Sequence, residues 1–303
     1  MIKYSIIIPH YYSPDLLVRC LKSIPVREDI QEIVVDDCSP DADTYLAKYA
    51  ELSRPYLELY STGTNGGGGK ARNVGLLHAK GAWVLFADAD DYFVEGFVGI
   101  LENYSSTSAD IVFFNVRCFN EAGKVVRGIK EKIYELYEQR GDERVFRYCY
   151  TEPWGKMFRR SLIADNDIRF EEVIVANDFL FSVKTGYYAK EVIIGDEYLY
   201  NYTVMASSTS RGKMSERKVV ARLVEKVKVQ KFLESHGVKT DYNLLSYVPR
   251  IKKFFPIITR NETEVFKKMD YPIWPVIRDR LTLLYKKLTC KSVELNPNTR
   301  NFI

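Results

Sequence analysis

Three carboxylates that end an apolar run are the residues best suited to do chemistry. Residues 83–86 are followed by Asp88, Asp90 and Asp91, so like charges crowd the mouth of an expected buried strand. Such crowding is relieved when a positive charge lies among the acids. Residues two apart on an extended segment point to the same side, so Asp88 and Asp90 could hold a hard divalent cation. The alternative is that Asp90 and Asp91 cap a helix beginning near Val94.

A glycine run is the second chemical signal. Asn65 is followed by four glycines, 66–69, and then by Lys70, Ala71 and Arg72. Without Cβ atoms the backbone N–H groups can approach a ligand closely, and the start of the following helix favours anions. The run is no P-loop, because Ala71 stands where that motif needs Ser or Thr. The alternative to an anion site is a flexible connector.

Strand and helix patterns alternate along the first hundred residues. The expected strands are 4–9, 32–35, 56–61 and 83–86, and the expected helices follow Ser13 and span 41–52 and 71–79. This order predicts an α/β fold with a mostly parallel sheet flanked by helices on both faces. Ligands of such sheets bind beyond the carboxyl ends of the strands, where residues 9–12, 36–39 and 88–91 meet.

The pattern changes after residue 100. A hairpin over 111–119 and 124–129 and a helix over 134–150 are expected, and an acidic stretch over 166–178 leads into another helix. From 214 the chain is expected to be mainly helical, with Lys, Arg, Tyr and Phe in abundance. We therefore expect a boundary near 212, after a polar loop.

Composition excludes several classes of protein. The net charge is +4, from 44 basic and 40 acidic residues, which is too slight to indicate nucleic-acid binding. The five cysteines lie far apart without metal-ligand spacing, so reduced thiols in an intracellular protein are expected. No secretory leader pattern and no apolar run of membrane-spanning length occurs, which predicts a cytoplasmic location.

Four ordered blocks carry a family resemblance. Residues 5–9 (SIIIP), 35–41 (VDDCSPD), 65–73 (NGGGGKARN) and 88–91 (DADD) resemble family 2 glycosyltransferases with the GT-A fold, which is Rossmann-like. The resemblance implies a GT-A domain over 1–212, with a nucleotide-binding half (1–100) and an acceptor-binding half (101–212), followed by a helical region over 213–303. It also implies inverting transfer from a nucleotide-sugar, a UDP-sugar, to a hydroxyl of a glycan or lipid-linked saccharide in surface polysaccharide synthesis. A divalent cation, Mn²⁺ or Mg²⁺, is implied as cofactor.

The resemblance further implies roles for single residues. Asp178 would be the general base, with Asn177 beside it where the family has Glu. Asp88 and Asp90 would bind the metal, with Asp90 the direct ligand, and Asp91 would be only a cap. The implied nucleotide-sugar contacts are Pro9, Tyr11, Asp36, Asp37, Gly69, Lys70, Arg72, Asp88, Ala89 and Asp90. Which of Asp36 and Asp37 contacts the base stays open.

The acceptor or sugar pocket would come from the later half. Residues 154–162 resemble the family's Trp-Asn-Lys-Leu segment, with Gly155 in place of Asn, so Trp154 and Lys156 join Asn177 there. Residues 202–211 resemble the loop that closes over the diphosphate, which Ser208 and Arg211 would contact. An Asp that opens a helix is otherwise a helix cap, which is the alternative role for Asp178.

Two other functions stay open. A metal-dependent sugar nucleotidyltransferase would carry a glycine-rich signature after the first strand, where residues 10–13 read HYYS. A catalytically silent nucleotide-sugar-binding module would lack the acidic base. In the C-terminal region, residues 251–255 and 277–288 combine basic and apolar side chains, which suits either peripheral contact with the cytoplasmic face of an anionic membrane or ordinary packing with a solvated basic face.

Overall fold

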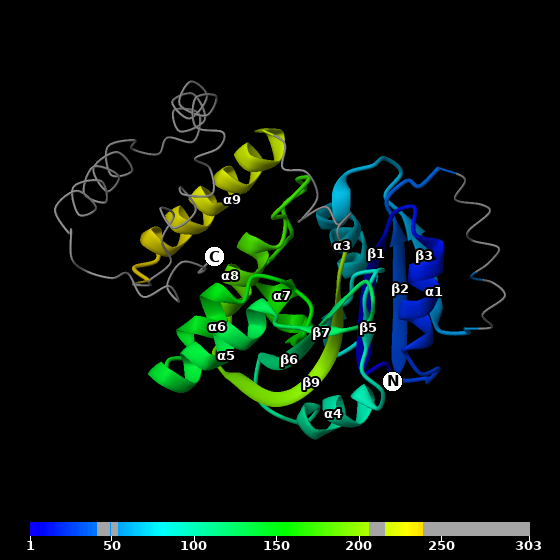
Figure 1. The fold of residues 1–303 in the computed structure, drawn as a ribbon, viewed down its shortest axis with the longest axis horizontal. Coiled ribbons are helices and arrows are strands. Elements are labelled where there is room, and N and C mark those ends of the chain that lie inside the picture. Colours follow the sequence, from blue (N-terminus) through cyan, green and yellow to red (C-terminus); the bar gives the residue numbers. More distant parts are fainter. Residues whose placement is uncertain (41–48, 50–53, 206–215, 239–303) are drawn as a thin grey trace. The chain divides into compact units, whose positions relative to one another are not determined.

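The computed structural model describes residues 1–40, 49, 54–205 and 216–238. The chain divides into two compact units, Met1–Lys213 and Met214–Ile303. The first unit holds one mixed sheet flanked by helices (Figure 1). Of the second unit, helix α9 (Glu216–Ser235) is described. Within the described ranges, no helix has both the length and the apolar character needed to cross a bilayer.

The N-terminal half of the sheet is parallel, as predicted. Its elements are β1 (Tyr4–His10), α1 (Pro14–Lys22), β2 (Ile30–Asp36), β3 (Leu57–Ser61), α3 (Gly67–His78) and β4 (Trp83–Phe86). The strands lie side by side in the order β3-β2-β1-β4, with every pair parallel. Burial of both faces explains the unbroken apolar runs at 6–9 in β1 and 33–35 in β2. Their carboxyl ends therefore share one edge.

The glycine run belongs to a helix rather than to a connector. Helix α3 begins at Gly67, four residues before the predicted start at 71. Farther along, Gly75 faces the sheet, where an added Cβ would lie 2.4 Å from Cγ2 of Ile7. Glycine at this position therefore lets α3 approach β1 closely.

The C-terminal half of the sheet is mixed rather than mostly parallel. Its strands are β5 (Tyr92–Phe93), β6 (Ile111–Asn120), β7 (Val125–Val126), β8 (Lys156–Arg159) and β9 (Val192–Val204). The order continues β4-β8-β6-β9-β5, and β7 pairs with β6. Among the described strands of this half, β6 and β9 are the one parallel pair. Figure 1 shows β9 as a long curved strand, which the sequence reading did not predict.

Helices α5 to α8 gather on one side of β9 (Figure 1). They are α5 (Ile129–Arg140), α6 (Arg144–Cys149), α7 (Arg160–Asp165) and α8 (Phe179–Tyr188), and α4 (Phe97–Tyr104) lies elsewhere on the sheet. The predicted single helix over 134–150 is wrong, because Gly141 adopts φ +63° and ends α5. The predicted hairpin is real but its second strand is short, since α5 begins at Ile129.

Several predictions fall on residues outside the described ranges. The helix over 41–52 is described only at Tyr49. Ser208 and Arg211, predicted to contact the diphosphate, lie outside as well, and so do the basic and apolar segments 251–255 and 277–288.

Candidate active site

The three carboxylates after β4 lie together. Ligand oxygens of Asp88, Asp90 and Asp91 are all within 4.8 Å of one another. Asp91 is fully buried; its Oδ1 accepts a hydrogen bond of 2.7 Å from the Thr203 N–H, and its Oδ2 has no partner among the described residues. The prediction that Asp91 is a helix cap is wrong, because α4 begins only at Phe97. The burial of Asp91 places it in the acidic cluster instead.

The electrostatics of this acidic cluster favour a cation. Burial, and then the neighbouring charge of Asp88, raise the pKa of Asp90 to about 6. Burial, followed by the charges of Asp90 and Asp88, raises the pKa of Asp91 well above its usual range. Three hard oxygen donors with an unpartnered buried oxygen among them fit Mn²⁺ or Mg²⁺, which take oxygen ligands and would supply the missing positive charge.

Strand β9 and helix α1 hold the acidic cluster in place. The Asp88 N–H donates to the Tyr200 hydroxyl at 2.8 Å. Arg19 donates through Nη2 to the Asp90 carbonyl oxygen and, at 3.1 Å, to Oγ1 of Thr203. The sequence did not predict these partners, because it did not predict β9. Tyrosines at 198, 200 and 202 recur at every second residue, which is a strand signal that could have revealed it.

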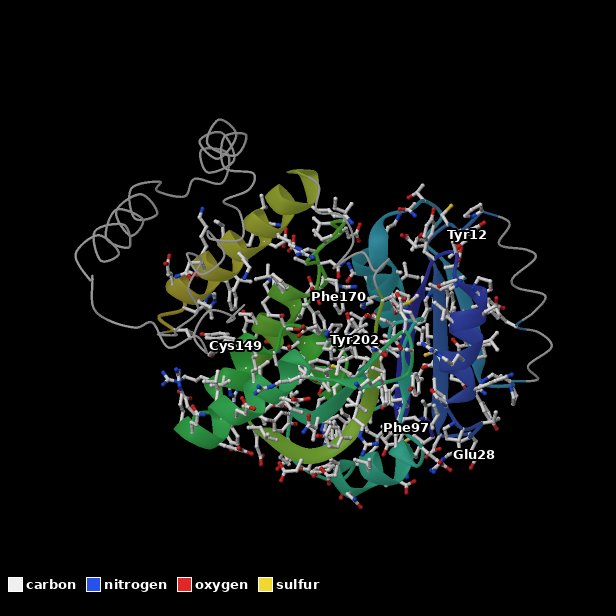
Figure 2. The ribbon with its side chains drawn as sticks, viewed as in Figure 1. Tyr12, Glu28, Phe97, Cys149, Phe170 and Tyr202 are labelled. Carbon is white, nitrogen blue, oxygen red and sulfur yellow. The ribbon has the colours of Figure 1, made fainter. Side chains whose placement is uncertain are left out.

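Arg72 links the acidic cluster to the predicted base. Its Nη2 donates to Oδ1 of Asp88 at 2.5 Å, and its Nη1 donates to Oδ1 of Asn177 at 3.0 Å. The guanidinium is buried over the ring of Phe170, which Figure 2 labels in the interior of the unit. Asp178 follows Asn177 directly. The hydrogen bonds of Arg72 therefore connect the acidic cluster to the residue that precedes Asp178.

Asp178 has no capping role. It precedes the first residue of α8, but its side chain makes no capping hydrogen bond. Burial of the Asp178 carboxyl group, and then the negative charge of Glu152, raise the pKa of Asp178 to about 6. A carboxylate with such a pKa is ionised at neutral pH and still holds a proton well, as a general base must.

The Asp37 carboxylate accepts hydrogen bonds from other residues of the protein. Its oxygens accept hydrogen bonds from the N–H groups of Gly66 at 2.9 Å and Gly67 at 2.6 Å, and from the Thr62 hydroxyl at 2.9 Å. The first amides of α3, predicted to approach a ligand, are therefore already satisfied by a side chain. Gly69 is needed for another reason, since an added Cβ would lie 2.1 Å from the Glu171 carbonyl oxygen.

Asp36 is also occupied by internal donors. Its carboxylate accepts from the N–H and hydroxyl of Ser39 at 2.8 and 2.6 Å, and from Nδ1 of His10 at 2.9 Å. Burial by itself would raise the pKa of Asp36, but these hydrogen bonds outweigh burial and lower it. Tyr11, by contrast, is 52% exposed beyond the end of β1, near the edge at which Figure 2 labels Tyr12.

The remaining predicted nucleotide contacts differ in accessibility. Pro9 is partly buried within β1, and Ala89 is buried between the acids of the cluster. Lys70 is engaged, because its Nζ donates to Oγ1 of Thr64 at 2.6 Å. The contacts of all three with a nucleotide-sugar remain predictions.

Trp154 and Lys156 lie in a buried aromatic layer. Trp154 stacks on Tyr200 and on Tyr202, with ring centroids 5.7 and 5.1 Å apart, and Figure 2 labels Tyr202. Lys156 is buried and donates through Nζ to the Tyr150 carbonyl oxygen. Gly155 adopts φ +67°, and a Cβ there would lie 2.2 Å from the Tyr150 hydroxyl oxygen. That contact explains why a larger residue does not occupy this position.

Comparisons with known proteins identify the class. Residues 5–167 match the model of glycosyl transferase family 2, and the chain belongs to this family. A poly(ribitol-phosphate) beta-N-acetylglucosaminyltransferase, TarS of Staphylococcus aureus, is 31% identical over 213 residues, which are 67% of this chain and 35% of that protein. A poly(ribitol-phosphate) beta-glucosyltransferase of Bacillus spizizenii is 30% identical over 211 residues, covering 67% of this chain and 32% of its own length.

The fold agrees with this assignment. A crystal structure of S. aureus TarS 1–349 in complex with UDP-GlcNAc superposes with a TM-score of 0.59 and 26% identity, over 75% of this chain and 66% of that one. The predicted GT-A type fold and the predicted family are thus confirmed. The chain spans about a third of the length of these curated relatives.

Proposed function

We propose that this family 2 glycosyltransferase moves a sugar from a UDP-sugar to a hydroxyl group of a surface polysaccharide or its precursor, with inversion at the anomeric carbon. The observation that carries the proposal is the pair of hydrogen bonds by which Arg72 joins Asp88 to Asn177, the residue directly before Asp178. It supports a site that combines the Asp178 carboxylate, as the base, with an acidic cluster suited to a metal. The relatives, whose names specify glucosyl or N-acetylglucosaminyl transfer to poly(ribitol phosphate), support a hydroxyl-bearing polymer as acceptor.

Asp178 performs the proton transfer in this proposal. Its carboxylate takes the proton of the acceptor hydroxyl while the hydroxyl oxygen attacks the anomeric carbon. The bond from that carbon to the nucleoside diphosphate breaks on the opposite face, so a single in-line step inverts the configuration. Arg72 places positive charge beside Asp88, at the end of the site where the diphosphate would bind.

The acidic cluster has the residues to hold a divalent cation. Asp88 and Asp90, joined by Asp91, would be its ligands. When bound, Mn²⁺ or Mg²⁺ stabilises the negative charge that develops on the departing diphosphate. Asp88 is fixed for this purpose by Arg72 and, through its own N–H, by Tyr200.

A nucleotide-sugar panel tests the proposal. We expect the purified protein to release UDP from one of UDP-glucose, UDP-GlcNAc and UDP-galactose with Mn²⁺ or Mg²⁺, faster with a polyol-phosphate or saccharide acceptor, and to stop in chelator. Pyrophosphate release from UTP and a sugar phosphate would instead indicate a nucleotidyltransferase. Tight UDP binding without release from any donor would indicate a silent binding module.

A further inference from the structure

The ring of Trp154, which the family resemblance assigns to the acceptor or sugar pocket, is covered by other side chains. The residue is only 5% exposed. Its ring stacks on those of Tyr200 and Tyr202 with interplanar angles of 16° and 21°, and Nζ of Lys130 lies 5.2 Å from its centroid. A sugar that stacks on an aromatic ring needs an open face of that ring. The burial of Trp154 therefore favours a different role.

The backbone next to Trp154 is anchored to the sheet. The carbonyl oxygen of Gly155 accepts a hydrogen bond of 2.9 Å from the N–H of Phe114 on β6. The next residue, Lys156, begins β8, which pairs with β4 on one side and β6 on the other. Because the chain is fixed on the C-terminal side of Trp154 and its ring is packed against three side chains, Trp154 is suited to support its neighbours.

Tyr200 connects the ring of Trp154 to the acidic cluster. Tyr200 is fully buried on β9, and its hydroxyl oxygen accepts the Asp88 N–H at 2.8 Å. Its ring centroid lies 5.7 Å from that of Trp154 in a stacked arrangement and 5.3 Å from that of Phe93 in an edge-on arrangement. Both arrangements are favourable for aromatic pairs. The two contacts fix the ring of Tyr200, and they thereby fix the hydroxyl that holds Asp88.

Strand β9 holds the acidic cluster at a second point. The N–H of Thr203 donates to Oδ1 of Asp91 at 2.7 Å. The strand that follows Asp91 directly, β5, pairs antiparallel with β9, and Phe93 lies opposite Tyr200 in this pairing. The segment that carries the three acids is therefore held by β9 on both sides of Asp90. Trp154 packs against β9 within the same stretch, at Tyr200 and Tyr202.

We propose that Trp154 is a positioning residue for the metal site: it holds the ring of Tyr200, whose hydroxyl in turn fixes the backbone of Asp88. The inference rests on the proposed function, in which Asp88 is a ligand of the divalent cation. Groups that orient metal ligands affect metal affinity even though they do not touch the ion. Trp154 thus acts on metal binding, whereas a ring that stacks on a sugar would act on the binding of the nucleotide-sugar or the acceptor.

Tyr200→Phe tests the hydroxyl, since it keeps the ring and removes only the acceptor of the Asp88 N–H. We expect the affinity for Mn²⁺ in the presence of UDP, measured by calorimetry, to fall by about tenfold. Saturating Mn²⁺ should restore kcat, so that the KM for the metal carries the effect. Tyr134→Phe is the matched control, because Tyr134 is also buried and its hydroxyl donates to the carbonyl oxygen of Gly195, outside the acidic cluster.

Trp154→Phe tests whether the indole ring acts through Tyr200. The smaller ring stacks less well, so the Mn²⁺ affinity should fall at least about threefold, and it should fall further in Trp154→Leu, which has no ring. In the double variant Trp154→Phe with Tyr200→Phe the two losses should not add, because both act on one hydrogen bond. Trp83→Phe is the control for lost stability: Trp83 is 1% exposed beneath Arg159 at the start of β4, so the melting temperature should fall with Mn²⁺ affinity unchanged.

Hydrogen exchange provides a measurement that needs no metal. In the metal-free protein, the Asp88 N–H should exchange faster in Trp154→Phe and in Tyr200→Phe than in wild type. Unchanged Mn²⁺ affinity in Trp154→Phe would overturn the inference, and a raised KM for the nucleotide-sugar or the acceptor at saturating Mn²⁺ would then make Trp154 a sugar contact. A wild-type protein that binds no Mn²⁺ with UDP would instead overturn the metal site of the proposed function, while the exchange of the Asp88 N–H would still decide whether Trp154 acts on Asp88.

Discussion

Two acidic segments lie at the ends of β2 and β4, which flank β1 in the parallel half of the sheet, and their carboxylates have different surroundings. Asp36 and Asp37, at the end of β2, are surrounded by the chain's own donors: backbone N–H groups, hydroxyls and a histidine. Asp88, Asp90 and Asp91, after β4, crowd together with few donors, and two of them have raised pKa values. Acidic residues at the end of a strand therefore do not indicate a single role. Carboxylates surrounded by internal donors stabilise the fold, and carboxylates with few such donors remain available for a ligand.

The largest expected effect concerns Asp178, which belongs to the second kind. Asp178→Asn removes the proton acceptor but keeps the side-chain shape, so sugar transfer should fall by about a hundredfold to ten-thousandfold. UDP binding, measured by calorimetry, should change little. Asp167→Asn is the control, because that side chain is 84% exposed. Near-normal transfer by the Asp178 variant would show that another group is the base.

Asp90 is expected to give the next largest effect. Asp90→Asn removes one charged ligand from the acidic cluster, so the affinity for Mn²⁺ in the presence of UDP should fall by at least roughly tenfold to a hundredfold. The melting temperature without metal should not fall, because like-charge repulsion is relieved. Asp142→Asn, at an acid paired with Arg144 on the surface, should leave metal affinity unchanged. Normal titration with Mn²⁺ by the Asp90 variant would argue against a metal site here.

Asp37 tests whether the acids at the end of β2 stabilise the fold. Asp37→Ala leaves the N–H groups of Gly66 and Gly67 without a partner at the start of α3, so urea unfolding should show a loss of about 1–3 kcal/mol. Asp37→Asn, which keeps one acceptor oxygen, should lose less. If either variant abolished UDP binding with stability unchanged, Asp37 would be a ligand contact and the comparison would fail.

The sequence predicted the elements of the N-terminal half but not the partners of each acid. The alternating strand and helix patterns predicted β1 to β4, and the four ordered blocks indicated the family. Both are local features of the sequence. Asp91 was misjudged because its burial depends on Thr203, which lies 112 residues away on a strand that was not foreseen. No pattern in the sequence around Lys130 or Glu152 indicates that these two residues pair. Their pairing exists only because α5 and the segment before β8 fold onto one aromatic layer.

The smallest expected effect is a pH dependence that separates the two kinds of acid. The folded pKa of Asp90, about 6, lies above its ordinary value of 3.8, so the folded protein retains a proton that the unfolded chain has released. The contribution of the Asp90 carboxyl group to the free energy of unfolding is largest below about pH 4 and is lost as the pH rises through 6. In chelator, the advantage of Asp90→Asn over wild type should therefore grow between pH 5 and 7.5, by on the order of 1 kcal/mol after allowance for solvent screening.

Asp142 provides a control of opposite sign for this pH dependence. The hydrogen bond from Arg144 lowers the pKa of Asp142, so its contribution to stability is present at neutral pH and is lost only as the pH falls through the lowered value. Asp142→Asn should accordingly show no growing advantage between pH 5 and 7.5. Thermal melts of the three proteins across this range measure both trends. Parallel curves for wild type and Asp90→Asn would mean that the Asp90 carboxylate is already compensated in the free protein, and that internal donors do not distinguish the two acidic segments.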